Sequence, residues 1–216
     1  MKERGVLFDV DGTLHDTYEF IVQAFERSIE IHNLEHKTRE EIDQTVGLSL
    51  SECYRLLAPT GDIKKLCDTH RQFQDQSPHL IKPFPNTLTI LQNLKEMEFK
   101  IAAVTARDRS SAINNLERTG VIDYMDTVIA KDDVVNQKPD PESIFLAIKQ
   151  LNLKGEQSFM VGDSGVDIEA GKRAKVMATI GATYGFTGQK LAQFSPDYLI
   201  HNISEVIPTI VSHLEL

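Results

Sequence analysis

Short apolar runs that end in polar side chains constrain the fold of this chain most strongly. Residues 5–8 run into Asp9, residues 100–104 into Thr105, and residues 159–162 into Asp163. From residue 84 onward such runs alternate with helical patterns, which is typical of an α/β fold with a parallel sheet. Because ligands of open parallel sheets bind beyond the carboxyl ends of the strands, these polar residues are candidates for a site.

The first run continues into the segment Asp9-Val10-Asp11-Gly12. Strand side chains alternate between faces, so Asp9 and Asp11 are expected to point the same way. Gly12 allows the backbone to turn sharply close to a ligand. One carboxylate could attack phosphorus as a nucleophile while its neighbour serves as general acid and base. Taken alone, the segment is equally a strand that ends in a solvated Asp-Gly turn.

Two later segments add charged side chains. Lys138 precedes Pro139-Asp140-Pro141, where Asp140 can cap a helix and Pro141 can occupy its first position. Asp163 is followed four residues later by Asp167. The order strand-Asp-x-Asp-Gly-Thr, strand-Thr, Lys-Pro, strand-Gly-Asp-x-x-x-Asp resembles that of the haloacid dehalogenase-like (HAD) superfamily of phosphoryl-transfer enzymes. The resemblance extends over essentially the whole chain.

The resemblance implies an α/β fold: a Rossmann-like parallel sheet core with helices on both faces, plus an inserted all-helical cap. Residues 16–82 fit the insertion because they show no convincing strand, while Thr38 and Ser49, each followed three residues later by Glu, predict helix starts. We expect a core domain of residues 1–15 and 83–216 and a cap domain of residues 16–82. Further strands are expected within 122–130, 176–181 and 198–200, and a helix near 86–97.

Composition limits the partners and the compartment. The net charge of −9 disfavours nonspecific binding to nucleic acid or to an anionic membrane. No apolar stretch approaches the roughly 20 residues of a membrane span, and no signal peptide is evident at the N-terminus. The two cysteines, Cys53 and Cys67, lack the spacing of metal ligands and are expected as reduced, half-buried thiols. We expect a cytoplasmic protein.

By resemblance, the aspartates divide the chemistry among them. Asp9 is expected to be the nucleophile that forms an aspartyl-phosphate, and Asp11 the general acid and base. Asp163 is expected to bind Mg²⁺ together with Asp9 and the backbone carbonyl of Asp11, since oxygen ligands suit this ion. Asp167 is expected to orient the water shell of the metal or Lys138; the alternative is an aspartate that only favours the helix start.

The resemblance also implies residues that bind the phosphate and the substrate. Thr105 and Lys138 are expected to hold and neutralise the phosphate, and amides at a helix start are natural donors to an anion. The full set of expected substrate contacts is Gly12, Thr13, Ala106, Arg107, His15 and Gly47. His15 could equally be a partly exposed linker histidine. Gly47 could instead be the C-cap glycine of a helix.

Asp11 favours phosphate-ester chemistry, because dehalogenases of this superfamily lack the second aspartate. Gly162 stands where the best-known phosphomutases of this shape carry Glu, which favours a phosphatase. We therefore expect a Mg²⁺-dependent phosphatase of a small phosphorylated metabolite, resembling phosphoglycolate phosphatase and acting as a monomer or homodimer. The alternatives are a sugar phosphomutase resembling β-phosphoglucomutase, a small pyrophosphatase and, more remotely, a non-catalytic binding protein of the same fold.

Overall fold

The computed structural model describes residues 3–46 and 48–215, and these residues form two compact units. The first, here called the core unit, consists of residues 1–16 and 83–216. The second, here called the insert, consists of residues 17–82. Gly47, one of the expected substrate contacts, lies outside the described residues.

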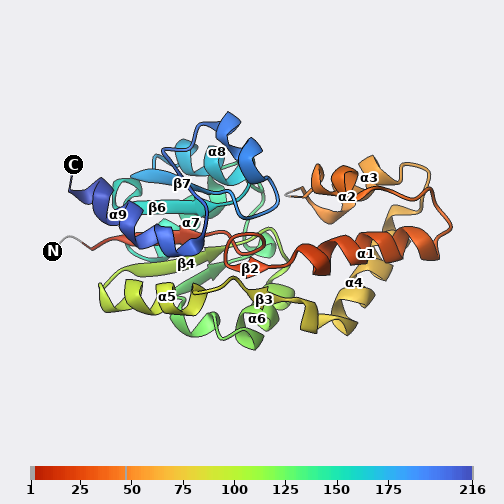
Figure 1. The fold of residues 1–216 in the computed structure, drawn as a ribbon, viewed down its shortest axis with the longest axis horizontal. Helices are drawn as coiled ribbons and strands as arrows, with labels where there is room; N and C mark the ends of the chain where they lie inside the picture. Colours follow the sequence, from red (N-terminus) through yellow and green to blue (C-terminus); the bar gives the residue numbers. More distant parts are fainter. Residues whose placement is uncertain (1–2, 47, 216) are drawn as a thin grey trace. The chain divides into compact units, whose positions relative to one another are not determined.

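A six-stranded sheet organises the core unit, in the order β5-β4-β1-β6-β7-β8 (Figure 1). Every pairing between its neighbouring strands is parallel. The strands are β1 (Gly5–Phe8), β4 (Lys100–Val104), β5 (Thr127–Ile129), β6 (Ser158–Gly162), β7 (Ala178–Ala182) and β8 (Tyr198–Ile200). At the end of β1, Phe8 pairs with Ala103 on one side and with Val161 on the other. The predicted parallel α/β fold is confirmed.

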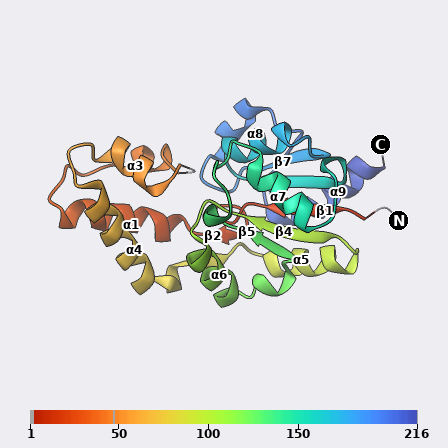
Figure 2. The same ribbon diagram turned by 180° about the vertical axis from the view of Figure 1, so that it is seen from behind.

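Helices cover both faces of this sheet (Figures 1 and 2). The helices of the core unit are α5 (Thr87–Glu96), α6 (Arg109–Arg118), α7 (Glu142–Gln150), α8 (Gly165–Arg173) and α9 (Val206–Leu214). Short 3₁₀ segments join them at Ile122–Tyr124, Lys131–Asp133, Gly155–Gln157, Gly188–Phe194 and Ile203–Glu205. Because a sheet covered on both faces has no solvated side, its strands are mostly apolar and do not alternate between apolar and polar residues.

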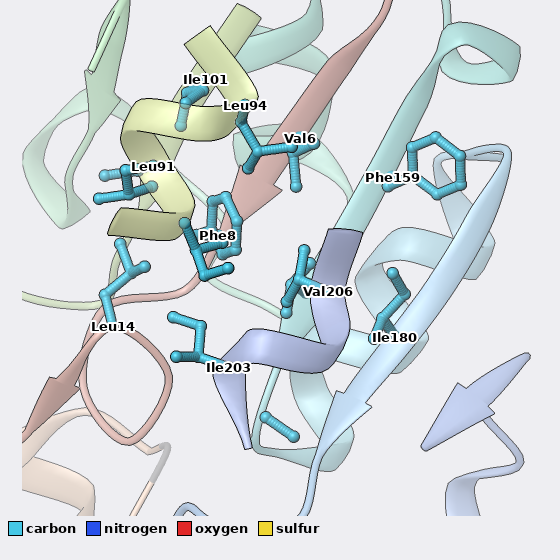
Figure 3. Close-up of a cluster of buried hydrophobic side chains, with 14 of the residues drawn as sticks. Val6, Phe8, Leu14, Leu91, Leu94, Ile101, Phe159, Ile180, Ile203 and Val206 are labelled. Atoms are coloured by element: carbon cyan, nitrogen blue, oxygen red, sulfur yellow. The ribbon is translucent and has the colours of Figure 1, made fainter. Parts of the chain in front are cut away.

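The central strand β1 shows how the two faces are filled. Val6 and Phe8 pack with Leu91 and Leu94 of α5 and with Val206 of α9 on one face (Figure 3). On the other face, Leu7 packs with residues of α7 and α8: Ile144, Ala147, Ile148 and Ala170. Burial on both faces places the end of β1, and therefore Asp9, in the interior of the core unit.

The insert is helical and has its own apolar core. Its helices are α1 (Tyr18–Ile31), α2 (Arg39–Asp43), α3 (Leu50–Leu57) and α4 (Ile63–Gln76), followed by a 3₁₀ turn at Pro78–Leu80. Both predicted helix starts are present, since Glu41 and Glu52 accept hydrogen bonds from the backbone amides of Thr38 and Ser49. The two cysteines are buried free thiols of this core rather than half-buried ones.

The structure corrects the expected secondary structure at three places. Two short strands, β2 (His15–Asp16) and β3 (Lys82–Pro83), form a separate sheet at the limits of the insertion, where no strand was expected. The strand expected within 122–130 is shortened to β5, because a 3₁₀ turn occupies its first residues. Helix α7 begins one residue later than expected, although the Asp140 side chain still accepts a hydrogen bond from the Glu142 amide at 3.0 Å.

Candidate active site

Three of the expected site residues follow neighbouring strands of the sheet. Asp9 follows β1, Thr105 follows β4 and Asp163 follows β6. Since β1 lies between β4 and β6 and all three are parallel, these residues meet at one edge of the sheet. Each is buried. The structure therefore brings together residues that are far apart in the sequence.

Lys138 lies at the centre of this group. Its ammonium donates hydrogen bonds to Asp9 Oδ1 at 2.7 Å, to Asp167 Oδ1 at 2.6 Å and to the Val104 carbonyl at 3.1 Å. These contacts use the three donors of a lysine. The two carboxylates raise the pKa of Lys138, although burial alone would lower it. Lys138 therefore stays charged and holds one oxygen of Asp9 in a fixed direction.

Asp9 and Asp163 are buried carboxylates whose pKa values are raised. Burial, opposed by Lys138 but aided by the neighbouring Asp167, raises the pKa of Asp9 to about 7. Burial and the charge of Asp9 raise the pKa of Asp163 well above its ordinary value. One carboxylate oxygen from each of Asp9, Asp163 and Asp167 lies within 4.8 Å of the others. This set of crowded oxygen donors fits a divalent cation, which would favour the ionised forms.

Asp167 differs from the other two aspartates because both of its oxygens are engaged. Oδ1 accepts from Lys138, while Oδ2 accepts from the Ser164 amide at 3.1 Å and from the Ser164 hydroxyl. The Asp167 side chain can pack this closely against residue 162 because that residue is glycine: a Cβ on Gly162 would lie 2.3 Å from the Asp167 Cβ. This arrangement suits a residue that orients Lys138 better than one that ligates a metal.

Asp11 is paired with Arg107, two residues beyond Thr105. Arg107 Nε donates to Asp11 Oδ2 at 2.6 Å and Nη2 donates to Oδ1 at 2.8 Å. The Arg107 amide also donates to Thr105 Oγ1 at 3.2 Å. The pair joins the expected acid–base residue to the segment expected to hold the phosphate, and no pattern in the sequence predicted this pairing.

The turn after β1 has the sharp geometry that Gly12 was expected to allow. Gly12 adopts a φ of +82°, and a Cβ at this position would lie 2.3 Å from Asp163 Oδ2. The Thr13 side chain is buried in the turn, and its carbonyl accepts a hydrogen bond from the Tyr184 hydroxyl at 3.0 Å. The glycine therefore lets the backbone of this turn lie directly against the Asp163 carboxylate.

His15 does not match the expectation of a partly exposed linker histidine. It is fully buried, and its Nε2 lies 2.8 Å from Thr119 Oγ1. Burial lowers the pKa of His15 to about 4, against the opposing effect of Asp11. The side chain therefore acts as a neutral structural contact in this structure. A substrate would reach His15 only if the surrounding side chains moved, so its substrate role stays a prediction.

The loop after β7 contributes residues that the sequence reasoning missed. The Phe186 amide donates to Asp163 Oδ2 at 2.7 Å. Gly185 passes so close that a Cβ would lie 2.3 Å from the Asp163 Cβ. The available signal was the glycine in Tyr184-Gly185-Phe186, directly after a strand, but nothing linked this loop to Asp163. The loop fixes the direction of one expected metal ligand.

Comparison with known proteins places this arrangement in a family. The model of the haloacid dehalogenase-like hydrolase family matches residues 6–180, which spans every residue of the site except the loop after β7. The chain belongs to this family. Among curated relatives, Pyrophosphatase PpaX of Halalkalibacterium halodurans is 31% identical over 210 residues, covering 96% of each chain. Pyrophosphatase PpaX of Listeria innocua is 32% identical over 209 residues, covering 95% of each.

Solved structures support the same HAD-like fold. A candidate haloacid dehalogenase-like hydrolase from Bacteroides fragilis has a TM-score of 0.87 at 30% identity, covering 95% of this chain and 100% of its own. A predicted phosphoglycolate phosphatase from Haemophilus somnus has a TM-score of 0.88 at 20% identity, covering 97% and 99%, and shows the fold alone. The chain is thus a HAD-like phosphatase. Within the described residues, no helix is long and apolar enough to cross a membrane.

Proposed function

We propose that this HAD-like phosphatase is Mg²⁺-dependent and hydrolyses pyrophosphate through an aspartyl-phosphate on Asp9. The observation that supports the substrate most directly is the full-length similarity to two curated pyrophosphatases. The phosphoglycolate-like ester expected from the sequence is the second candidate substrate, because the solved structures named phosphoglycolate phosphatase have low sequence identity to this chain. We further propose that the insert is the cap that helps to select the substrate.

Asp9 is suited to be the nucleophile by the way Lys138 holds it. Lys138 engages Oδ1, so Oδ2 is the oxygen that would attack phosphorus. The P–O bond to the leaving group breaks as the bond to Asp9 forms, and water later releases the phosphate from Asp9. Thr105, Lys138 and the amides of Ala106 and Arg107 would bind the oxygens of the transferred phosphoryl group.

Asp9, Asp163 and the Asp11 carbonyl would hold the metal, with Asp167 directing Lys138. Bound Mg²⁺ would offset the repulsion between this aspartate cluster and the phosphate charge. Asp11 would pass a proton to a leaving group that needs one and would take a proton from the water that attacks the intermediate. Phe186 and Gly185 would keep Asp163 directed toward the metal position.

The proposal is tested by phosphate release from pyrophosphate with Mg²⁺, with EDTA and after Mg²⁺ is restored. We expect activity only with Mg²⁺, and inhibition by Ca²⁺, which prefers larger and looser coordination. Asp9→Asn should lower kcat by a factor on the order of 10⁴ or more, as removal of a covalent nucleophile does. The matched control is Asp123→Asn, an exposed aspartate of the core unit, which should keep full activity.

Two results would contradict the proposal. Full turnover in EDTA would remove the metal assignment, and near-normal turnover by Asp9→Asn would remove the aspartyl-phosphate. If the protein hydrolysed phosphate esters but not pyrophosphate, only the proposed substrate would be wrong. Asp11→Asn adds a check on roles, because it should slow hydrolysis of the intermediate more than its formation from esters with good leaving groups.

A further inference from the structure

The pair between Arg107 and Asp11 has the geometry of a binding site for an anion. Both contacts join one guanidinium edge to one carboxylate, at 2.6 and 2.8 Å. The two side chains are only 12% and 18% exposed. A guanidinium binds a carboxylate or a phosphate with the same planar, two-point geometry. Asp11 therefore occupies Arg107 in the way that an anionic group of a substrate could.

The backbone of Arg107 is held on both sides, which limits where the guanidinium can reach. Its amide donates to Thr105 Oγ1 at 3.2 Å, and its carbonyl accepts from the Lys131 amide at 2.9 Å. Arg107 thus projects from the segment proposed to bind the transferred phosphoryl group toward Asp11, the group proposed to meet the leaving oxygen. That is the side on which the rest of the substrate must lie.

The other buried cation of the site is already committed. Lys138 donates to Asp9, to Asp167 and to the Val104 carbonyl. A bond to the transferred phosphoryl group already requires it to give up or share one of these contacts, so it has no donor left for a second anion. Arg107, by contrast, could exchange one carboxylate for another anion and keep its number of hydrogen bonds. Such an exchange leaves no buried donor unpaired, which keeps its cost low.

We propose that Arg107 selects substrates that carry a second anionic group beyond the transferred phosphoryl group, and that this group displaces Asp11 from Arg107. This inference rests on the proposed phosphatase function and names the class of its substrate. The displaced Asp11 turns to the leaving oxygen, so the correct substrate releases the acid–base residue that acts on it. Binding energy from a remote group then raises the rate of the reaction as well as the affinity.

The test compares two esters with alkoxide leaving groups, 2-phosphoglycolate and ethyl phosphate, which differ chiefly in a carboxylate. We expect kcat/KM for 2-phosphoglycolate to exceed that for ethyl phosphate by roughly 10- to 100-fold, the range expected for hydrogen bonds to a charged group. In Arg107→Gln this ratio should fall to about 3 or less, and in Arg107→Lys, which loses the two-point geometry, it should lie between. Arg118→Gln, an exposed arginine of α6, should keep the wild-type ratio.

The ratio separates selection from a general loss of activity or folding. If Arg107→Gln lowered kcat/KM equally for both esters, or left a large ratio between 2-phosphoglycolate and ethyl phosphate unchanged, the inference would be wrong. The proposed phosphatase activity would still stand. If Arg107→Gln did not fold, the wild-type protein would decide through competitive inhibition by 3-phosphonopropionate and by propylphosphonate, in which a CH2 group replaces the bridging oxygen of each ester. Equal inhibition by these two compounds would overturn the inference, and stronger inhibition by 3-phosphonopropionate would support it.

The same measurements keep the proposed function distinct from this inference. If neither ester nor pyrophosphate were hydrolysed with Mg²⁺, the proposed function would fail, and there would be no reaction for the two compounds to inhibit. If pyrophosphate were not hydrolysed but 2-phosphoglycolate were, with a ratio that depends on Arg107, the inference would stand and only the proposed substrate would change.

Discussion

The core unit and the insert both bury polar side chains, but they bury them in different charge states. In the insert, the Tyr54 hydroxyl lies 3.0 Å from His70 Nδ1, and the Ser28 hydroxyl donates to the Leu66 carbonyl at 2.9 Å. These contacts involve no carboxylate, lysine or arginine side chain and lie among packed rings and aliphatic side chains. In the core unit, Asp9, Asp163 and Asp167 are buried around Lys138.

The difference shows which buried groups are there for stability. Neutral hydrogen-bonded groups are inexpensive to bury, whereas charged groups cost several kcal/mol each unless they are paired. The raised pKa of Asp9 indicates that even Lys138 does not fully offset this cost. A chain that keeps such carboxylates at the ends of its central strands gains binding or catalysis from them, so mutations in the two units should separate activity from stability.

Among the variants that compare the two units, Lys138→Met is expected to have the largest effect, because it removes the positive partner of two buried carboxylates. Turnover of any substrate should fall by a factor of about 10³ or more, since both the phosphate and the nucleophile lose their positioning group. The free energy of unfolding at pH 8 should fall by about 3–5 kcal/mol, the cost of an unpaired buried charge. Denaturant titration and kcat measure the two losses, with Lys149→Met, an exposed lysine of α7, as control. An unchanged stability would mean that water enters the cluster.

In the insert, Tyr54→Ala should lower the free energy of unfolding without lowering the catalytic rate. Tyr54 is fully buried in the insert, so its truncation should cost about 3–5 kcal/mol. Tyr54→Phe should cost only about 1 kcal/mol, since it removes one hydrogen bond and keeps the ring. Hydrolysis of p-nitrophenyl phosphate, expressed per folded molecule, should stay within about threefold of wild type, because that ester needs little help from remote contacts. A loss like that of Lys138→Met would show that the insert takes part in chemistry.

The contrast between the units also bears on what the sequence could predict. The close approach of Asp9, Thr105 and Asp163 was predictable because each directly follows an apolar strand, and parallel strands bring such ends together. Lys138 was predictable only through the order of motifs. The pairing of Arg107 with Asp11 was not, because it depends on how two side chains turn within the site rather than on spacing. The Phe186 amide was missed for a related reason: a backbone donor leaves no signature in residue type.

The helical character of the insert was predictable, but the two short strands at its ends were not. Its capping boxes are local signals, and both helix starts were correct. Strands β2 and β3 were missed because each is two residues long, too short for an alternating pattern. His15 belongs to β2 and is buried against Thr119, which the sequence does not indicate, since the same position is compatible with a substrate contact or with a partly exposed linker.

A smaller effect should appear in the pH dependence of stability without metal. The pKa of Asp9 is raised to about 7 in the folded state, and that of Asp163 is also raised. The folded state therefore holds protons that the unfolded state releases above about pH 4, so stability should fall as pH rises from about 4 through 7. Excess Mg²⁺ should reverse this fall, because the metal binds the ionised carboxylates and its stabilisation grows with pH. Thermal unfolding at several pH values, with EDTA or Mg²⁺, measures both trends, and Asp163→Asn should weaken each of them.

The smallest effect is expected at a second arginine–carboxylate pair, which matches that of Arg107 in chemistry but not in burial. In the insert, Arg39 Nη1 and Nη2 donate to the Glu19 carboxylate at 2.6 and 3.2 Å. These side chains are 46% and 45% exposed, against 12% and 18% for Arg107 and Asp11. Water and salt screen an exposed pair, so Arg39→Gln should cost less than about 1 kcal/mol, and less still at high ionic strength. Denaturant titration at low and high salt measures this cost. A salt-independent loss of about 2 kcal/mol or more would mean that Arg39 is desolvated like Arg107. Exposure would then not explain why the Arg39–Glu19 pair is only structural, whereas a substrate anion could replace Asp11 on Arg107.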